Sequence, residues 1–145
     1  MTRERFVRVV VIEDNAPDVM LLEESLSGQN IRYEITHFRD GVEAISHLTD
    51  SHGVPTPDVI VLDLNMPKMG GLEVLENIKK HEHLSSVPVA ILTSSLAPEE
   101  RERAQKLGAN RFLRKPVDLY DYLTQVGDMV RELIPDSKSS AASES

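Results

Sequence analysis

The stretch DVIVLDLNMPKMGG, residues 58–71, runs from an apolar segment directly into a turn. Residues 58–62 are rich in β-branched side chains, which favour a buried β-strand. This strand ends on Asp63, and Pro67, Gly70 and Gly71 mark a loop after it. A carboxylate at the end of a buried strand either caps the following turn or takes part in chemistry.

The same order of strand and then helix occurs five times along the chain. Strands are predicted at residues 7–12, 31–38, 58–62, 87–92 and 111–113, and helices at 18–26, 41–48, 72–79, 98–107 and 119–133. Apolar strands without alternation, separated by helices, predict an α/β fold with a doubly wound parallel sheet and helices on both faces. Only the second strand alternates, as a strand near the sheet edge does. We predict one domain over residues 7–134, a lead-in over 1–6 and a disordered Ser-rich tail over 135–145.

The composition of the chain argues against several classes of function. The 145 residues carry a net charge of −8, which argues against non-specific binding to nucleic acid. There is no cysteine, so disulfides, thiolate catalysis and cysteine-ligated metals are excluded. Arg8 and Glu13 interrupt the first apolar run too early for a signal peptide or a membrane span, and we therefore expect a cytoplasmic protein.

Polar side chains follow four of the five predicted strands. In doubly wound sheets the site lies beyond the carboxyl ends of the strands. If these strands are neighbours, one crevice receives carboxylates, a hydroxyl and an ammonium: Glu13, Asp14, Asp63, Thr93 and Lys115. Three carboxylates at one place repel each other, and Mg²⁺ suits such an oxygen-rich site. A lysine and a hydroxyl then favour phosphoryl transfer, in which a carboxylate can be the nucleophile.

Each of these residues also has a purely structural interpretation. Asn15 and its acidic neighbours could simply begin the first helix, and Thr93 and Ser94 could cap a later one. Lys115 could be a solvated surface lysine, although its place between a core strand and Pro116 argues against this. The five histidines are scattered and predict no zinc site.

The segments VIEDN, DVIVLDLNMPKMGG, VAILTSS and FLRKP occur in this order and together resemble the receiver domain of bacterial response regulators. The resemblance covers about residues 7–133. It implies a flavodoxin-like five-stranded sheet of strand order 2-1-3-4-5. It also implies a signalling protein of a two-component phosphorelay rather than an enzyme.

Roles for individual residues follow from this resemblance. Asp63 resembles the phosphoacceptor, and the implied Mg²⁺ ligands are Asp14 as the more direct one, Glu13, Asp63 and the backbone carbonyl of Asn65. The implied phosphoryl-binding and switch residues are Thr93, Lys115 and Phe112, and the bond between Lys115 and Pro116 is implied to be cis. Phe112 lacks a hydroxyl, so we expect no hydrogen bond to water to hold its ring outward.

The combination of VIEDNAPDVMLLEESL with DLNMP, TSS and KPVDLYDYL is most similar to the small phytochrome-associated regulators. The implied partner is a sensor histidine kinase, of the phytochrome type according to this finer resemblance, or a histidine phosphotransfer protein. The Ser-rich tail is too short for a DNA-binding domain, so we expect output through protein contacts. The apolar stripe on the last helix could serve a homodimer or pack on the sheet.

Three rival functions remain at this point. A phosphatase of the haloacid dehalogenase kind has an acid/base aspartate at the position of Asn65, and an amide cannot shuttle protons. A nucleotide or flavin binder needs a glycine-rich or hydroxyl-rich loop after the first strand, where this chain has EDNAPD. A degenerate receiver that only binds partners is not favoured, since every acidic, hydroxyl and lysine position is intact.

Overall fold

The computed structural model describes residues 6–50, 55–66 and 68–134. The predicted tail, most of the predicted lead-in, part of the loop before the third strand, and Pro67 lie outside the described residues. Across the described ranges, every helix falls short of the length and hydrophobicity that a bilayer-spanning segment needs.

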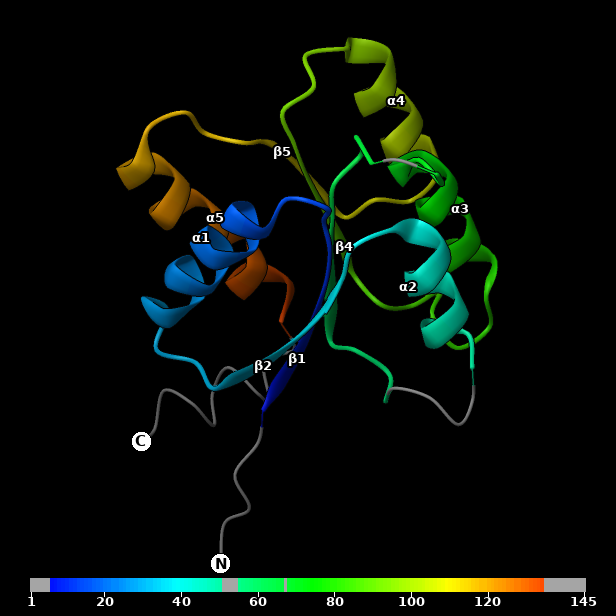
Figure 1. The fold of residues 1–145 in the computed structure, drawn as a ribbon, viewed down its shortest axis with the longest axis horizontal. Helices are drawn as coiled ribbons and strands as arrows, with labels where there is room; N and C mark the ends of the chain where they lie inside the picture. Colours follow the sequence, from blue (N-terminus) through cyan, green and yellow to red (C-terminus); the bar gives the residue numbers. More distant parts are fainter. Residues whose placement is uncertain (1–5, 51–54, 67, 135–145) are drawn as a thin grey trace, which may run out of the picture.

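Five strands alternate with five helices, as the sequence predicts (Figure 1). The strands are β1 (Val7–Ile12), β2 (Tyr33–Phe38), β3 (Val59–Leu62), β4 (Val89–Thr93) and β5 (Arg111–Arg114). The helices are α1 (Ala16–Ser27), α2 (Gly41–Leu48), α3 (Gly71–Lys80), α4 (Pro98–Lys106) and α5 (Leu119–Leu133).

The first residues of α1 and β4 differ from the predicted ones, and in each case a single neighbouring residue explains the difference. Helix α1 begins at Ala16, two positions earlier than predicted, because the Asn15 side chain accepts a hydrogen bond from Asp18 N and caps it. Strand β4 begins at Val89 instead of Val87, because Pro88 has no N–H to donate to the ladder.

All five strands are parallel and lie in the order β2-β1-β3-β4-β5, which confirms the expected strand order. Helices α1 and α5 lie on one face of the sheet and α2, α3 and α4 on the other (Figure 1). β2 and β5 are the edge strands, so the predicted edge position of the alternating segment is also confirmed. This doubly wound arrangement brings the carboxyl ends of all strands to the same edge of the sheet.

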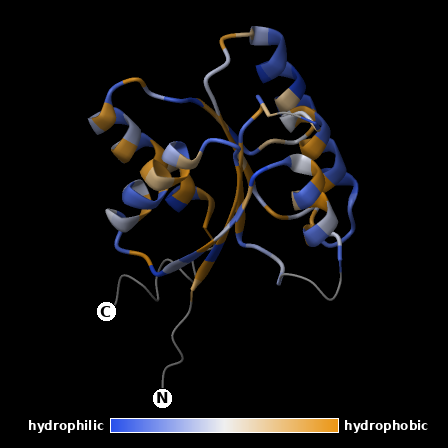
Figure 2. Cartoon of the chain, in the orientation of Figure 1, coloured by the Kyte–Doolittle hydropathy of each residue, from blue (hydrophilic) through white to orange (hydrophobic). Residues whose placement is uncertain are grey.

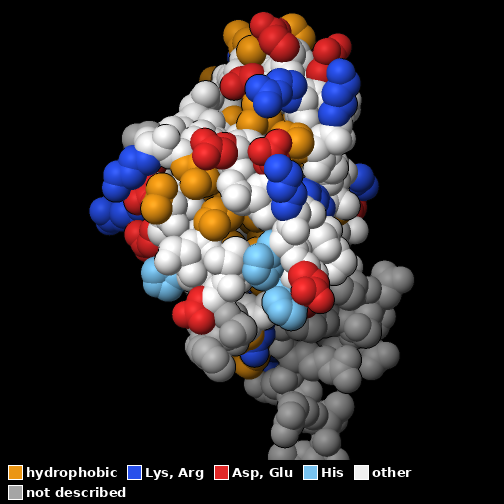
Figure 3. Space-filling model, turned by 90° about the vertical axis from the view of Figure 1, so that its right-hand side faces the viewer, with side chains coloured by type: hydrophobic (Ala, Val, Ile, Leu, Met, Phe, Trp, Pro, Cys, Tyr) orange, Lys and Arg blue, Asp and Glu red, His pale blue; other side chains and the backbone are white. Residues whose placement is uncertain are grey.

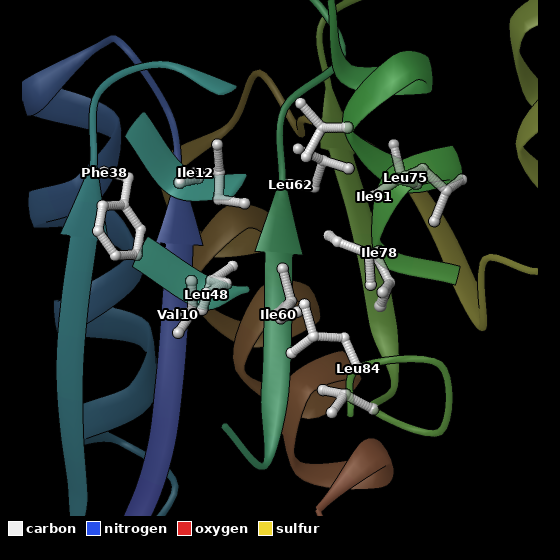
Figure 4. Packing of buried hydrophobic residues seen from close by; sticks show 14 of the residues in the cluster. Val10, Ile12, Phe38, Leu48, Ile60, Leu62, Leu75, Ile78, Leu84 and Ile91 are labelled. Atoms are coloured by element: carbon white, nitrogen blue, oxygen red, sulfur yellow. The ribbon is translucent and has the colours of Figure 1, made fainter. Parts of the chain in front are cut away.

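The core has two layers, one on each face of the sheet. Strand β1 divides its side chains between them: Val9 and Val11 face α1 and α5, whereas Val10 and Ile12 face the other helices. Figure 4 shows the second layer, in which strand and helix side chains meet: Val10, Ile12, Phe38, Leu48, Ile60, Leu62, Leu75, Ile78, Leu84 and Ile91. Apolar residues lie along the strands and the inner sides of the helices (Figure 2). Each large aliphatic side chain buried in this way stabilises the fold by about 1.5–3 kcal/mol.

The outer face of α2, α3 and α4 carries side chains of both charge signs, with apolar side chains exposed between them (Figure 3). On the opposite side, the apolar stripe of α5 is used by the fold: Val126 and Val130 are fully buried in the layer shared with α1. The stripe therefore gives no separate support for a homodimer. Leu119, the first residue of α5, is 58% exposed.

Candidate functional site

The end of β3 places a carboxylate in the interior. Asp63 is only 5% exposed, and its backbone N–H donates to the carbonyl of Ile12 at 3.0 Å, which fixes it beside β1. Its Oδ1 accepts a hydrogen bond from the backbone N–H of Asn65 at 3.2 Å. Asp63 therefore does stabilise the turn, as the structural interpretation proposed, and its carboxylate also interacts with the side chain of Glu13.

The end of β1 brings two more carboxylates to the same place. Glu13 is 5% exposed and Asp14 is exposed, and one oxygen from each lies within 4.8 Å of one oxygen of Asp63. Asn15 alone caps α1, so the acidic pair is not used as the cap. The Glu13 carboxylate accepts a hydrogen bond from the Asn15 N–H at 3.3 Å, and the Glu13 carbonyl accepts one from Nε2 of His37 at 2.6 Å.

The electrostatics of this acidic cluster (Glu13, Asp14 and Asp63) favour binding of a cation. Burial raises the pKa of Glu13 to about 8; the hydrogen bond from Lys115 opposes this rise, and the nearby Asp63 adds to it. The donors are all hard oxygen atoms and include one accessible carboxylate. Such a set fits a small divalent cation such as Mg²⁺, which would relieve the repulsion.

Strand β4 ends on a buried hydroxyl. Thr93 is 0% exposed, and its Oγ1 accepts hydrogen bonds from the side-chain amide of Asn65 at 3.2 Å and from the backbone N–H of Ser95 at 3.1 Å. The N-cap of α4 is Ala97, so neither Thr93 nor Ser94 caps this helix. Ser95 instead accepts from Ala97 N and contacts Glu100. The cap interpretation of Thr93 is therefore wrong.

Lys115 follows β5 and reaches into the acidic cluster. Its side chain is 12% exposed, which rules out the interpretation as a solvated lysine. Nζ lies 2.8 Å from Glu13 Oε1 and 2.6 Å from Asp18 Oδ2. Burial lowers the pKa of this ammonium, but the hydrogen bonds to Asp18 and Glu13 outweigh burial and raise it.

The expectation of a cis bond between Lys115 and Pro116 is contradicted. No peptide bond among the described residues is cis, and both partners of this bond belong to them. The trans isomer of a bond before proline is more stable than the cis isomer by about 0.5–1 kcal/mol. Nothing in the local sequence around Pro116 reverses this preference.

Phe112 lies in β5, half-buried, and packs against the layer that contains α3 and α4. The guanidinium carbon of Arg101 lies 5.6 Å from the centre of its ring. The ring therefore has a cation–π partner on α4, a contact that the sequence did not predict.

Two contacts of the site were not predicted. Asp18 was assigned only to the start of a helix, yet its carboxylate binds Lys115 across 97 positions in sequence. His37 was grouped with the scattered histidines, yet it holds the backbone of Glu13. The signal for Asp18 was its place within EDNAPD, in the first turn of the helix that directly follows the acidic pair.

Comparisons with known proteins agree with this geometry. Residues 9–126 match the family described as the response regulator receiver domain. The chain is 34% identical over 121 residues to response regulator Rcp1 of Synechocystis, with 81% of this chain and 82% of that protein covered.

Solved structures resemble the whole described fold. The phosphorylated cyanobacterial phytochrome response regulator RcpA superposes with a TM-score of 0.80 at 30% identity, covering 86% of this chain and 91% of that one. The Mn²⁺-bound form of Rcp1 gives a TM-score of 0.77 at 32% identity, covering 85% and 91%. Because the family match spans most of the chain, and carboxylates, a hydroxyl and a lysine meet where the strands end, this protein belongs to the receiver-domain family of two-component response regulators.

Proposed function

We propose that the protein is a phosphorelay receiver in which Asp63 accepts a phosphoryl group. The observation that carries this proposal is the position of the Asp63 carboxylate. It is buried at the end of β3, with two carboxylates within 4.8 Å and with Lys115 hydrogen-bonded to one of them. A signalling role, rather than turnover of a small substrate, follows from the family.

The reaction is a displacement at phosphorus. A carboxylate oxygen of Asp63 forms the new P–O bond while the P–N bond of a phosphohistidine breaks, and the histidine nitrogen leaves with the bonding electrons. Thr93 supplies a hydroxyl and Lys115 an ammonium for the phosphoryl oxygens, so that the added charge is neutralised by groups already in place.

The residues present fit a divalent cation. Glu13, Asp14 and Asp63 would hold it, and we propose the backbone carbonyl of Asn65 as a further ligand. A bound Mg²⁺ neutralises charge on the carboxylates and the phosphoryl oxygens. The Mn²⁺-bound structure of the relative Rcp1 supports a divalent ion in this class of protein.

The rival phosphatase has little support. Its acid/base aspartate is replaced by Asn65, whose amide donates to Thr93 and carries no titratable proton. A nucleotide site is disfavoured because the loop after β1 brings carboxylates, not free N–H donors, to the crevice.

Receiver domains of response regulators pair with histidine kinases, and we propose such a kinase, or a histidine phosphotransfer protein, as the phosphoryl donor. The relative RcpA is a phytochrome response regulator by name, which supports a kinase of the phytochrome type. We further propose that residues 7–134 form the receiver and that it acts in the cytoplasm, where the kinase has ATP. Output is through protein contacts.

Intact mass spectrometry after incubation with acetyl phosphate and Mg²⁺ tests the proposal. The parent protein should gain one phosphoryl group, and Asp63→Asn should gain none. Asp58→Asn is a matched control, because Asp58 precedes the same strand at its opposite end and should leave the mass gain unchanged. A phosphoryl group on Asp63→Asn would refute the assignment, as would an unmodified parent.

A further inference from the structure

Lys115 is shared between two carboxylates in the structure. Glu13 belongs to the acidic cluster beside Asp63, whereas Asp18 lies outside that cluster, in the first turn of α1. The contact with Asp18 is the shorter one, at 2.6 Å against 2.8 Å. Among the described residues, the ion pairs of Lys115 are with Glu13 and Asp18 and not with Asp63.

Asp18 is held in place by its own surroundings. Its backbone N–H donates to the Asn15 side chain at 3.2 Å, and its carbonyl accepts a hydrogen bond from the Tyr122 hydroxyl at 3.3 Å. The carboxylate is 24% exposed and is therefore partly shielded from water. Asp18 thus presents a held negative charge to Lys115 from the first turn of α1 and is not a member of the acidic cluster.

A phosphoryl group on Asp63 would compete for the same ammonium. An ammonium has three N–H donors, and here two of them are occupied by carboxylates. We infer that movement of Nζ toward Asp63 lengthens its contact with Asp18, whose carboxylate is not part of the acidic cluster around Asp63.

We propose that Asp18 is a positioning residue that holds Lys115 away from Asp63 and so lowers the affinity of the site for a phosphoryl group. The inference rests on the proposed function and extends it to a residue that regulates the same site. It predicts that removing the charge of Asp18 favours the phosphoryl-bound state, because Lys115 then does not have to break an ion pair with Asp18.

Beryllofluoride, which stands in for the phosphoryl group on a carboxylate, is the probe. Its dissociation constant with saturating Mg²⁺ is measured by NMR titration for the parent, Asp18→Asn, Asp18→Glu and Asp121→Asn. Asp121 also lies in the first turn of a helix and is exposed, so Asp121→Asn makes the same charge change and controls for net charge and helix dipole. Mg²⁺ alone is titrated in parallel.

Asp18→Asn should bind beryllofluoride about fivefold more tightly, the size expected for one partly shielded ion pair, with Mg²⁺ affinity changed less than about twofold. Asp18→Glu should lie closer to the parent, and Asp121→Asn should match it. Equal or weaker beryllofluoride binding by Asp18→Asn overturns the proposal. A change in Mg²⁺ affinity as large as the change for beryllofluoride also overturns it, because that pattern indicates a general disturbance of the site.

A second measurement needs only the parent protein. The carboxyl ¹³C resonance of Asp18 should shift when beryllofluoride binds, as Lys115 leaves it, and an unchanged resonance overturns the proposal even if Asp18→Asn folds poorly. A parent that binds no beryllofluoride refutes the proposed function itself. If instead the parent binds beryllofluoride and Asp18→Asn binds it equally well, only the proposed role of Asp18 is refuted.

Discussion

The side-chain amide of Asn65 donates to the hydroxyl oxygen of Thr93 across 3.2 Å and ties the loop after β3 to the end of β4. The same oxygen accepts the N–H of Ser95, so the hydroxyl of Thr93 is oriented before any ligand is present. A phosphoryl group on Asp63 that took this hydroxyl would disturb both contacts at once. The position of Thr93 is thereby linked to the start of the segment that leads into α4.

Removing the hydroxyl of Thr93 should weaken binding of a phosphoryl mimic. Thr93→Val keeps the buried volume but loses the donor, and a hydrogen bond to a charged group contributes about 1.5–3 kcal/mol. Beryllofluoride affinity should therefore fall about tenfold or more, measured by NMR titration with Mg²⁺. Thr93→Ser retains the hydroxyl and should stay within about threefold of the parent. Parent-like binding by Thr93→Val would show that another group serves the phosphoryl oxygens.

Arg101 should restrain the ring of Phe112. The cation–π contact at 5.6 Å contributes about 0.5–1 kcal/mol at an exposed site, so Arg101→Gln should raise the population of ring positions other than the observed one about two- to fivefold. Side-chain NMR of Phe112 without any phosphoryl mimic measures this population. Arg103→Gln, two positions along α4, removes a positive charge without removing the ring contact. If both variants change the ring equally, net charge and not the contact is responsible.

Asp14 should contribute to metal binding without supporting the fold. Its carboxylate is exposed and belongs to a cluster of three like charges, so Asp14→Asn should weaken Mg²⁺ binding about tenfold, while the melting temperature of the metal-free protein stays equal or rises. Calorimetric Mg²⁺ titration and thermal unfolding measure the two effects. Glu24→Gln removes a negative charge farther along α1 and should leave Mg²⁺ affinity unchanged. Unaltered Mg²⁺ binding by Asp14→Asn would place the ion elsewhere.

Two adjacent glycines should respond oppositely to alanine. A Cβ at Gly71 would lie 2.5 Å from the carbonyl oxygen of Asp63 and 2.5 Å from Cα of Leu64, so backbone must move. Gly71→Ala should therefore cost about 1–3 kcal/mol in the free energy of unfolding, as overpacking does. Gly70 has no atom within 4 Å of such a Cβ, and Gly70→Ala should stay within about 0.5 kcal/mol of the parent. Urea denaturation compares them; equal losses would refute the steric explanation.

Tyr122 should make stability fall at high pH. Burial, followed by the charge of Asp18, raises the pKa of Tyr122 above its ordinary value of about 10. Above that pH the unfolded chain releases a proton that the folded protein keeps, so the free energy of unfolding decreases as pH rises. Lys115, whose pKa is also raised, contributes in the same direction.

Tyr122→Phe should reduce this slope without removing it. The variant also loses the hydrogen bond to the Asp18 carbonyl, which lowers stability by about 1 kcal/mol independently of pH. Urea denaturation at intervals from pH 8 to above about 10 separates the offset from the slope. A variant with the parent's slope would exclude Tyr122 as the source.

The fold was predictable because its signals are local and repeated. Hydrophobic periodicity predicts each strand and helix, and the parallel sheet then brings Glu13, Asp63, Thr93 and Lys115 to one edge. The contacts of Asp18 with Lys115 and of Arg101 with Phe112 were not predictable, because they depend on how α1 and α4 are rotated against the sheet. The isomer before Pro116 was predicted wrongly, because the prediction came from the family resemblance, whereas the intrinsic preference before proline is trans.

The hydrogen bond between Lys115 and Glu13 joins positions 102 residues apart, so the acceptor site exists only after the first and last strands have docked on the same sheet. A chain still emerging from the ribosome exposes Asp63 well before Lys115 is synthesised. Such a nascent or partly folded chain has its acceptor carboxylate without the charges that serve it. Under the proposed function, only completely folded copies of the protein can therefore accept a phosphoryl group.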